Sequence, residues 1–248
     1  MRATKYKKEY DVKSHEVDCH GFLRLLSLMN TLQDIAVENA DKLGLGLEVC
    51  AQHDLAWVGS NYLVQIFRMP RQHEHFVIET WPAETKLWGA IRDFIVTDES
   101  GKTIILASSQ WVLIDAKRRR PVMLSKYFPD YEALGERVLK TDFPKLPAVG
   151  ESAQKTSFKV RFDDIDVNGH VNNTIYPLWA SESVDKDYRM THLPAQIELC
   201  FKKEALYGET VDVFTEQTGD ESLHSIRNTK SGEDDVLAQC RIKWVNLV

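Results

Sequence analysis

The stretch RFDDIDVNGHVNNTIYPLWASE, residues 161–182, places three polar side chains at a strict spacing of two, just before an apolar segment. These side chains are Asp166, Asn168 and His170. Polar groups that enter a buried helix cost free energy unless they are hydrogen-bonded, so either a turn or a functional site must explain the pattern. On the local sequence alone the two interpretations weigh about equally, because such residues commonly form turns and caps.

The stretch has a counterpart near the N-terminus, which indicates an internal repeat. Residues 16–21, EVDCHG, match residues 164–169, DIDVNG. Each match is followed by apolar residues at three- and four-residue steps, which predict helices over Leu25–Leu43 and Asn172–Val184. Strand-like runs accompany each helix, one before it and the others after it. They are Glu9–Val17, Ala56–Arg68, Phe76–Trp81, Gly89–Thr97 and Thr103–Asp115 in the first half, and Lys159–Ile165, Ala195–Lys203, Thr210–Gln217, Ser222–Thr229 and Val236–Asn246 in the second, with turns at Asp98–Lys102 and Ser231–Asp234.

Proline and glycine interrupt both patterns between the two halves. Pro129, Pro144 and Pro147 lie there together with Gly135 and Gly150, which is typical of a linker. The expected organisation is an N-terminal unit over residues 1–126, a linker over 127–157 and a C-terminal unit over 158–248. One long helix against a curled antiparallel sheet, repeated once, predicts the α+β class and a double hot-dog arrangement.

Composition and charge exclude several classes of protein. The 248 residues are 43% hydrophobic and 27% charged, as in a globular protein large enough to bury a full core. A net charge of −6 argues against nucleic-acid binding. No apolar run reaches the roughly 18 residues of a membrane span, and the charged N-terminus does not resemble a secretory signal. Scattered cysteines without paired spacing favour reduced thiols in the cytoplasm.

The repeat supplies an internal comparison at the polar stretch. At its three polar positions the second half has Asp166, Asn168 and His170, whereas the first half has Asp18, His20 and Phe22. Residues 202–204, KKE, align with residues 68–70, RMP, so the first half also lacks the second carboxylate. If the stretch only formed a turn, both copies could have the same polar residues. We therefore expect the second copy to be a site and the first to be a scaffold or pocket wall.

Residues 164–173, DIDVNGHVNN, with Tyr176 and Trp179 after them, resemble the signature of the acyl-acyl-carrier-protein (acyl-ACP) thioesterases of plants and bacteria. The likeness covers nearly the whole chain, and the N-terminus without a transit peptide is similar to the bacterial members. The resemblance implies a hydrolase of fatty acid biosynthesis that releases free fatty acid from acyl carrier protein in the cytoplasm, without a cofactor or a metal. It implies the catalytic residues Asp166, Asn168, His170 and Glu204.

The chemistry expected of these four residues is activation of water. Glu204 can act as the general base, and Asn168 can donate to the thioester carbonyl or position the water. His170 can orient its neighbours, shuttle a proton or replace Glu204 as base, while Asp166 holds its neighbours by hydrogen bonds. Some plant members have a cysteine after the glutamate, but this chain has Ala205, and it has no G-x-S-x-G motif. Direct attack by water, without an acyl-enzyme, is therefore expected.

A run of four basic residues is the candidate contact for a partner. Lys117, Arg118, Arg119 and Arg120 stand together in an acidic protein, and composition alone favours a solvated loop. The resemblance supplies an acidic acyl carrier protein, which local basic charge would steer. The sequence leaves open whether two copies form a homodimer, and which acyl chain is preferred. Three rival functions also stay open: an acyl-CoA thioesterase, a hot-dog enoyl hydratase or dehydratase, and a non-catalytic acyl-chain binder.

Overall fold

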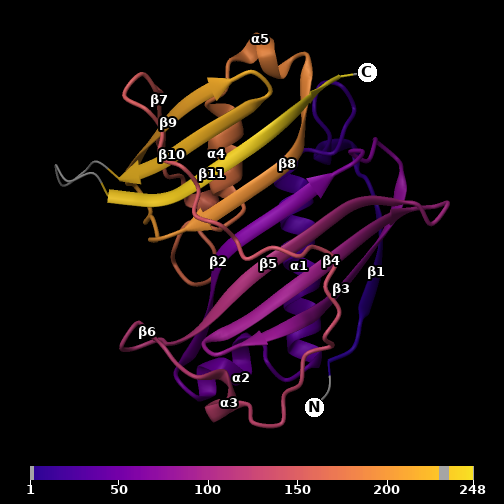
Figure 1. The fold of residues 1–248 in the computed structure, drawn as a ribbon, viewed down its shortest axis with the longest axis vertical. Coiled ribbons are helices and arrows are strands. Elements are labelled where there is room, and N and C mark those ends of the chain that lie inside the picture. The colour runs from indigo at the N-terminus through magenta and orange to yellow at the C-terminus, as the bar shows by residue number, and fades with distance from the viewer. Residues whose placement is uncertain (1–2, 229–234, 248) are drawn as a thin grey trace. The chain divides into compact units, whose positions relative to one another are not determined.

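The computed structural model describes residues 3–228 and 235–247, so the turn expected at Ser231–Asp234 lies outside the described residues. The chain forms two compact units, Met1–Asp142 and Phe143–Val248. In each unit one principal helix lies behind an antiparallel sheet, α1 in the first and α4 in the second (Figure 1). The predicted α+β class and the two hot-dog units are confirmed.

The first unit contains a sheet with the strand order β1-β3-β4-β5-β2, and β6 pairs with β5. Every neighbouring pair is antiparallel. The strands are β1 (Tyr6–Asp11), β2 (Leu55–Ile66), β3 (His75–Lys86), β4 (Gly89–Asp98), β5 (Thr103–Asp115) and β6 (Arg120–Pro121). The helices are α1 (Leu25–Lys42), α2 (Leu47–Gln52), α3 (Leu124–Tyr127) and the 3₁₀ turn η1 (Ser14–Glu16).

Helix α1 supplies the core of the first unit from one apolar stripe. Leu28, Leu32 and Ile35 recur at steps of three and four residues and are fully buried. The helix packs against β3 and β1, and the sheet adds buried apolar side chains such as Ile78. Gly44, with a φ of +64°, follows the helix in the left-handed region, which favours glycine. The helix predicted over Leu25–Leu43 is therefore confirmed.

The second unit repeats the strand order of the first, as β8-β11-β10-β9-β7. Its strands are β7 (Gln154–Lys159), β8 (His192–Phe201), β9 (Thr210–Thr218), β10 (Glu221–Asn228) and β11 (Asp235–Asn246). Its helices are α4 (Ile175–Glu182), α5 (Lys186–Arg189) and the 3₁₀ turn η2 (Phe162–Asp164). Pro177 lies in the first turn of α4, where its missing N–H costs little. Helix α4 is shorter than the Asn172–Val184 range predicted from the sequence.

Two strand predictions are wrong at equivalent places. The strands expected over Glu9–Val17 and Lys159–Ile165 stop at Asp11 and Lys159, and a 3₁₀ turn follows each of them. A carboxylate closes each turn by accepting the backbone N–H three residues before it. The N–H of Lys13 donates to Glu16 over 2.8 Å, and the N–H of Arg161 donates to Asp164 over 2.8 Å. These bonds interrupt the extended backbone that the apolar pattern suggested.

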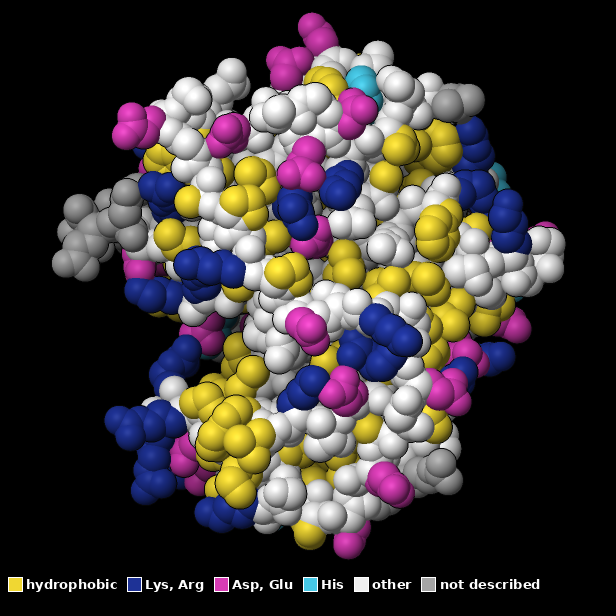
Figure 2. Space-filling view, viewed as in Figure 1, with side chains coloured by type: hydrophobic (Ala, Val, Ile, Leu, Met, Phe, Trp, Pro, Cys, Tyr) yellow, Lys and Arg dark blue, Asp and Glu magenta, His cyan; other side chains and the backbone are white. Residues whose placement is uncertain are grey.

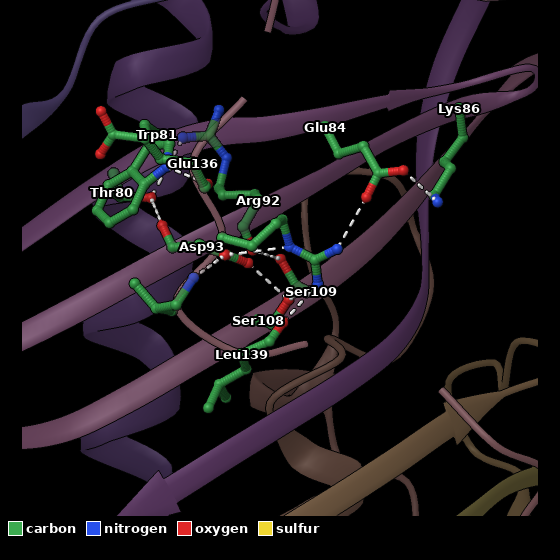
Figure 3. Close-up of polar contacts among 12 residues, drawn as sticks. Thr80, Trp81, Glu84, Lys86, Arg92, Asp93, Ser108, Ser109, Glu136 and Leu139 are labelled. Carbon is green, nitrogen blue, oxygen red and sulfur yellow. Dashed lines mark hydrogen bonds and ion pairs between the residues drawn. The ribbon is translucent and has the colours of Figure 1, made fainter. Parts of the chain in front are cut away.

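Part of the segment expected to be a linker is tied to the sheet of the first unit. We call residues 134–139 the strap. Its backbone N–H groups at Leu134 and Gly135 donate to the carbonyls of β3, and Val138 N donates to the Asp93 carboxylate over 2.7 Å. Asp93 is fully buried and also accepts from Ser108 (Figure 3). The ordered backbone of β7 likewise begins at Gln154, inside the range expected for the linker.

Candidate functional site

The polar stretch of the second unit forms a tight loop. Asp166 N donates to the carbonyl of His170 over 2.8 Å, and Gly169 N donates to the carbonyl of Asp166 over 3.0 Å. Gly169 has a φ of +79°, which only glycine adopts readily. The Asp166 carboxylate accepts the backbone N–H of Asn168 over 2.8 Å and its side-chain amide over 3.3 Å. Asp166 and Asn168 are therefore one hydrogen-bonded pair, and Asp166 shapes the loop.

The first unit contains the same loop. Asp18 N donates to the carbonyl of Phe22 over 2.8 Å, His20 N donates to the Asp18 carboxylate over 2.9 Å, and Gly21 has a φ of +78°. The aspartate is thus kept in both copies together with the turn that it makes. The copies differ at the other two polar positions, where the first unit has His20 in place of Asn168 and Phe22 in place of His170.

His170 and Glu204 form the second pair. The Nε2 atom of His170 lies 3.2 Å from a carboxylate oxygen of Glu204, although the residues are far apart in the sequence. The pair forms because Val171 N donates to the carbonyl of Ala205 over 2.9 Å, which aligns the loop with the segment that leaves β8. The two side chains are 28% and 33% exposed, so water and a ligand can reach them. A histidine paired with a carboxylate can accept and pass on a proton.

Tyr176 of α4 fixes the backbone beside Glu204. Its hydroxyl oxygen accepts the N–H of Ala205 over 3.1 Å, and its ring packs edge-on against Trp179 and Phe201. Burial raises the pKa of Tyr176, so the hydroxyl stays protonated at neutral pH. Sequence reasoning did not name Tyr176 as a site residue, because its role depends on a contact 29 positions along the chain.

The corresponding place in the first unit holds different side chains. Leu23 N donates to the carbonyl of Pro70 over 2.8 Å, the equivalent of the Val171–Ala205 bond, so Met69 takes the position of Glu204. The sequence alignment, which set Pro70 against Glu204, was off by one residue. The Arg71 guanidinium lies over the ring of Phe22, 4.2 Å from its centroid. The first unit therefore keeps the backbone of the loop without the histidine–carboxylate pair.

Four large apolar side chains stay exposed around the His170–Glu204 pair. They are Phe162, Val167, Leu206 and Tyr207. The rings of Phe162 and Tyr207 meet edge-on with centroids 6.1 Å apart. The equivalent positions of the first unit are equally exposed but hold Ser14, Cys19, Arg71 and Gln72. Apolar side chains gathered on one surface often mark an interaction site, and at these four positions the first unit has no large apolar side chain.

A second histidine of this unit belongs to a buried polar cluster. The Nδ1 atom of His224 lies 2.9 Å from the Thr215 hydroxyl, and its Nε2 atom lies 2.8 Å from the Ser222 hydroxyl. Burial lowers the pKa of His224 to about 3, so the ring is neutral at physiological pH. Both ring nitrogens have partners, and we therefore assign His224 to the core of the unit.

The basic run of the first unit forms the turn between β5 and β6. Asp115 accepts the backbone N–H groups of Lys117 and Arg118, over 3.0 and 2.8 Å. The Lys117 ammonium pairs with Asp54 over 2.6 Å, and the Arg118 guanidinium lies 3.7 Å from Asp115. All four basic side chains, Lys117, Arg118, Arg119 and Arg120, are exposed. The run is thus a solvated turn on the surface of the first unit.

Within residues 3–228 and 235–247, no three His, Cys, Asp or Glu side chains are grouped so that they could hold a metal ion. Across the same part of the chain no helix is both long and apolar enough to span a bilayer.

Solved structures with the same fold match almost all of the chain. An acyl-ACP thioesterase from Bacteroides thetaiotaomicron matches with a TM-score of 0.87 and 23% identity, covering 97% of this chain and 98% of that chain. A 12:0-ACP thioesterase from Umbellularia californica matches with a TM-score of 0.86 and 22% identity, covering 98% of each. At these identities the matches show a shared fold.

Curated relatives are chloroplastic plant enzymes. An acyl-[acyl-carrier-protein] hydrolase of Cuphea viscosissima is 26% identical over 258 residues, covering 96% of this chain and 62% of the relative. Oleoyl-acyl carrier protein thioesterase 1 of Arabidopsis thaliana is 28% identical over 235 residues, covering 87% and 64%. The chain thus spans less than two thirds of the length of these relatives.

Two family models match consecutive parts of the chain. The acyl-ACP thioesterase N-terminal domain matches residues 3–130, and the acyl-ACP thioesterase C-terminal domain matches residues 148–246. Together the two models cover most of both units. The chain therefore belongs to the acyl-ACP thioesterase family.

Proposed function

We propose that this chain hydrolyses the thioester of fatty acyl-ACP and releases free fatty acid and the thiol of the carrier. The observation that carries the proposal is the His170–Glu204 pair at 3.2 Å in the second unit, where the first unit has Phe22 and Met69. Family membership and relatives named as acyl-ACP hydrolases support the substrate class.

The proposed reaction is direct attack by water on the thioester carbonyl. The His170–Glu204 pair takes a proton from the water as its oxygen bonds to the carbonyl carbon. The amide of Asn168 is exposed and can donate to the developing oxyanion. The C–S bond then breaks, and the thiol leaves readily as a thiolate because its pKa is near 8.5. Asp166 holds the Asn168 side chain and backbone by its two hydrogen bonds.

These steps use side chains and water alone, with no cofactor and no covalent acyl-enzyme. Ala205 is buried and offers no nucleophile at the position where some plant members have a cysteine. Isolation of a covalent acyl-enzyme from a slow variant would contradict this mechanism. We also place the protein in the cytoplasm, since scattered cysteines without paired spacing suit reduced thiols.

Hydrolysis of a panel of acyl thioesters, with free thiol as the readout, tests the proposed function. We expect thiol release from acyl-ACP at lower substrate concentrations than from acyl-CoA. Equal use of both carriers would favour an acyl-CoA thioesterase. Hydration of an enoyl thioester without thiol release would favour a hydratase, and tight binding without turnover would favour an acyl-chain binder.

The basic run is the proposed long-range contact for the carrier protein. Arg119→Glu with Arg120→Glu should raise KM for acyl-ACP about tenfold at low salt and less at high salt, because exposed charges act by screened steering. KM for a small acyl thioester should stay unchanged. Lys140→Glu with Lys145→Glu, which changes the net charge equally at exposed positions, is the matched control. An equal response of both substrates would show that the run does not contact the carrier.

Tyr176 is a proposed positioning residue. Tyr176→Phe removes the acceptor for Ala205 N, which should cost about 1–3 kcal/mol of unfolding free energy because a buried N–H loses its partner. The backbone beside Glu204 would then shift, and kcat should fall about tenfold while KM changes little. Steady-state kinetics at several substrate concentrations separate the two constants. A loss of stability with unchanged kcat would leave Tyr176 a purely structural residue.

A further inference from the structure

An unusual turn joins β3 and β4 in the first unit. Its two residues are Leu87 and Trp88, which are 61% and 46% exposed. Neither residue has a positive φ, so the turn admits most residue types and does not call for large apolar ones. The equivalent turn of the second unit, between β9 and β10, has Gly219 and Asp220. The geometry of the turn therefore does not explain a leucine and a tryptophan.

A third exposed apolar residue lies beside this turn. Leu124 N donates to the carbonyl of Leu87 over 3.3 Å, which brings Met123, 42% exposed, next to it. Leu113 N donates to the carbonyl of Trp88 over 2.8 Å, so the turn is held against β5. We call Leu87, Trp88 and Met123 the apolar patch. Its backbone is anchored on both sides, and its side chains are presented to solvent in a fixed place.

The apolar patch lies at the same end of the sheet as the basic run. β5 continues from Leu113, which holds the patch, to Asp115, which pairs with Arg120 across the β5–β6 turn. Figure 2 shows Lys and Arg side chains gathered at the lower left margin, next to a group of hydrophobic side chains, where Figure 1 draws β6. The surface thus combines apolar side chains with a local excess of positive charge in a chain of net charge −6.

Further cations reinforce this character on both sides of the patch. The half-buried Lys86 precedes the turn and the exposed Lys126 follows Met123, in addition to the four cations of the basic run. Lys86, Lys117 and Arg118 pair with the carboxylates of Glu84, Asp54 and Asp115. The other basic side chains of the run and Lys126 are exposed, which adds positive charge to this surface. Such a surface complements a partner that exposes carboxylates around apolar side chains.

We propose that the apolar patch and the basic run together form the docking surface for the acyl carrier protein. This inference rests on the proposed function, since the carrier brings the thioester. The basic run raises the association rate by electrostatic steering. The apolar patch contacts apolar side chains of the carrier and lowers the dissociation rate. An anionic membrane offers similar chemistry, but Trp88 is only 46% exposed, which limits the apolar area that it can bury in a bilayer.

The test uses a double variant that combines Leu87→Ser and Trp88→Ser. Its control is Val37→Ser, which removes an exposed apolar side chain from α1. Three substrates carry the same acyl chain on the carrier protein, on CoA and on N-acetylcysteamine. The double variant should raise KM for acyl-ACP about tenfold and leave kcat unchanged, because contacts at the centre of an interface carry most of its affinity. KM for the two small thioesters, and all constants of Val37→Ser, should not change.

Other results would overturn the docking surface. An unchanged KM for acyl-ACP, or an equal loss with all three substrates, would remove the carrier as the ligand of the patch. Binding of the native protein to phosphatidylglycerol vesicles that the double variant loses would assign the patch to a membrane. A native dimer that becomes a monomer in the double variant would assign it to a second copy. If the native protein releases thiol from none of the substrates, the proposed function fails, and titration with the phosphopantetheine-bearing carrier still decides whether the patch binds it.

Discussion

Glu204→Ala should lower kcat for acyl thioester hydrolysis by about a hundredfold or more, and His170→Ala should do the same. The two side chains meet at 3.2 Å, and we propose that together they take the proton of the attacking water. Removing either one leaves the other without its partner, so the water loses its activated state. Initial rates of thiol release at saturating substrate measure the loss. Because the residues act as a unit, the double variant should be only slightly slower than the slower single variant.

The repeat provides a matched control for this prediction. Asp18→Ala disturbs the loop of the first unit by removing the same turn-forming carboxylate that Asp166→Ala removes from the second. Both variants should lose similar unfolding free energy, but only Asp166→Ala should lower kcat, because only its loop carries the proposed site. Equal losses of activity at Asp18 and Asp166 would refute the assignment of chemistry to one copy. Retention of full activity by His170→Ala would refute the role of the pair.

Sequence periodicity predicted the regular elements well and their ends poorly. Helix α1 and the strands β4 and β5 lie within one residue of their predicted bounds. The two 3₁₀ turns were missed. Val17 and Ile165 continue an apolar pattern, and only the carboxylates of Glu16 and Asp164, bonding three residues back, show that the backbone turns there.

The candidate site was predictable in composition but not in arrangement. The loop residues stand together in the sequence, whereas Glu204 entered through the resemblance to the family. Whether Glu204 meets His170 depends on the hydrogen bond between Val171 N and the carbonyl of Ala205. No local sequence pattern gives the register of two segments that are far apart in the chain. The role of Tyr176 could not be predicted for the same reason. Its hydroxyl accepts the N–H of Ala205 only because α4 packs beside that segment.

Arg137→Met should cost the first unit about 3–5 kcal/mol of unfolding free energy at neutral pH, because it leaves a buried carboxylate without its charge partner. The Arg137 guanidinium donates to Asp93 over 3.2 Å, to Glu84 over 2.8 Å and to the carbonyl of Leu139 over 2.8 Å. Its side chain is 16% exposed and that of Asp93 is fully buried, so solvent screens the pair little. Urea unfolding of the native chain and the variant measures the difference.

The pH dependence of this loss separates a charge effect from lost packing. Burial raises the pKa of Asp93 above its usual value, and Arg137 opposes that rise. A carboxyl group whose pKa is raised on folding contributes most stability below the pKa of the unfolded chain and loses it as pH rises through the folded value. Removing Arg137 raises the folded pKa further, so the loss in Arg137→Met should shrink as pH falls from 7 toward 4. Asp93→Asn combined with Arg137→Met, in which neither position carries a charge, should recover part of the stability at pH 7 and show little of this pH dependence. A loss in Arg137→Met that is the same at every pH would mean that the strap is held by packing and neutral hydrogen bonds, and that the charge of Asp93 contributes nothing.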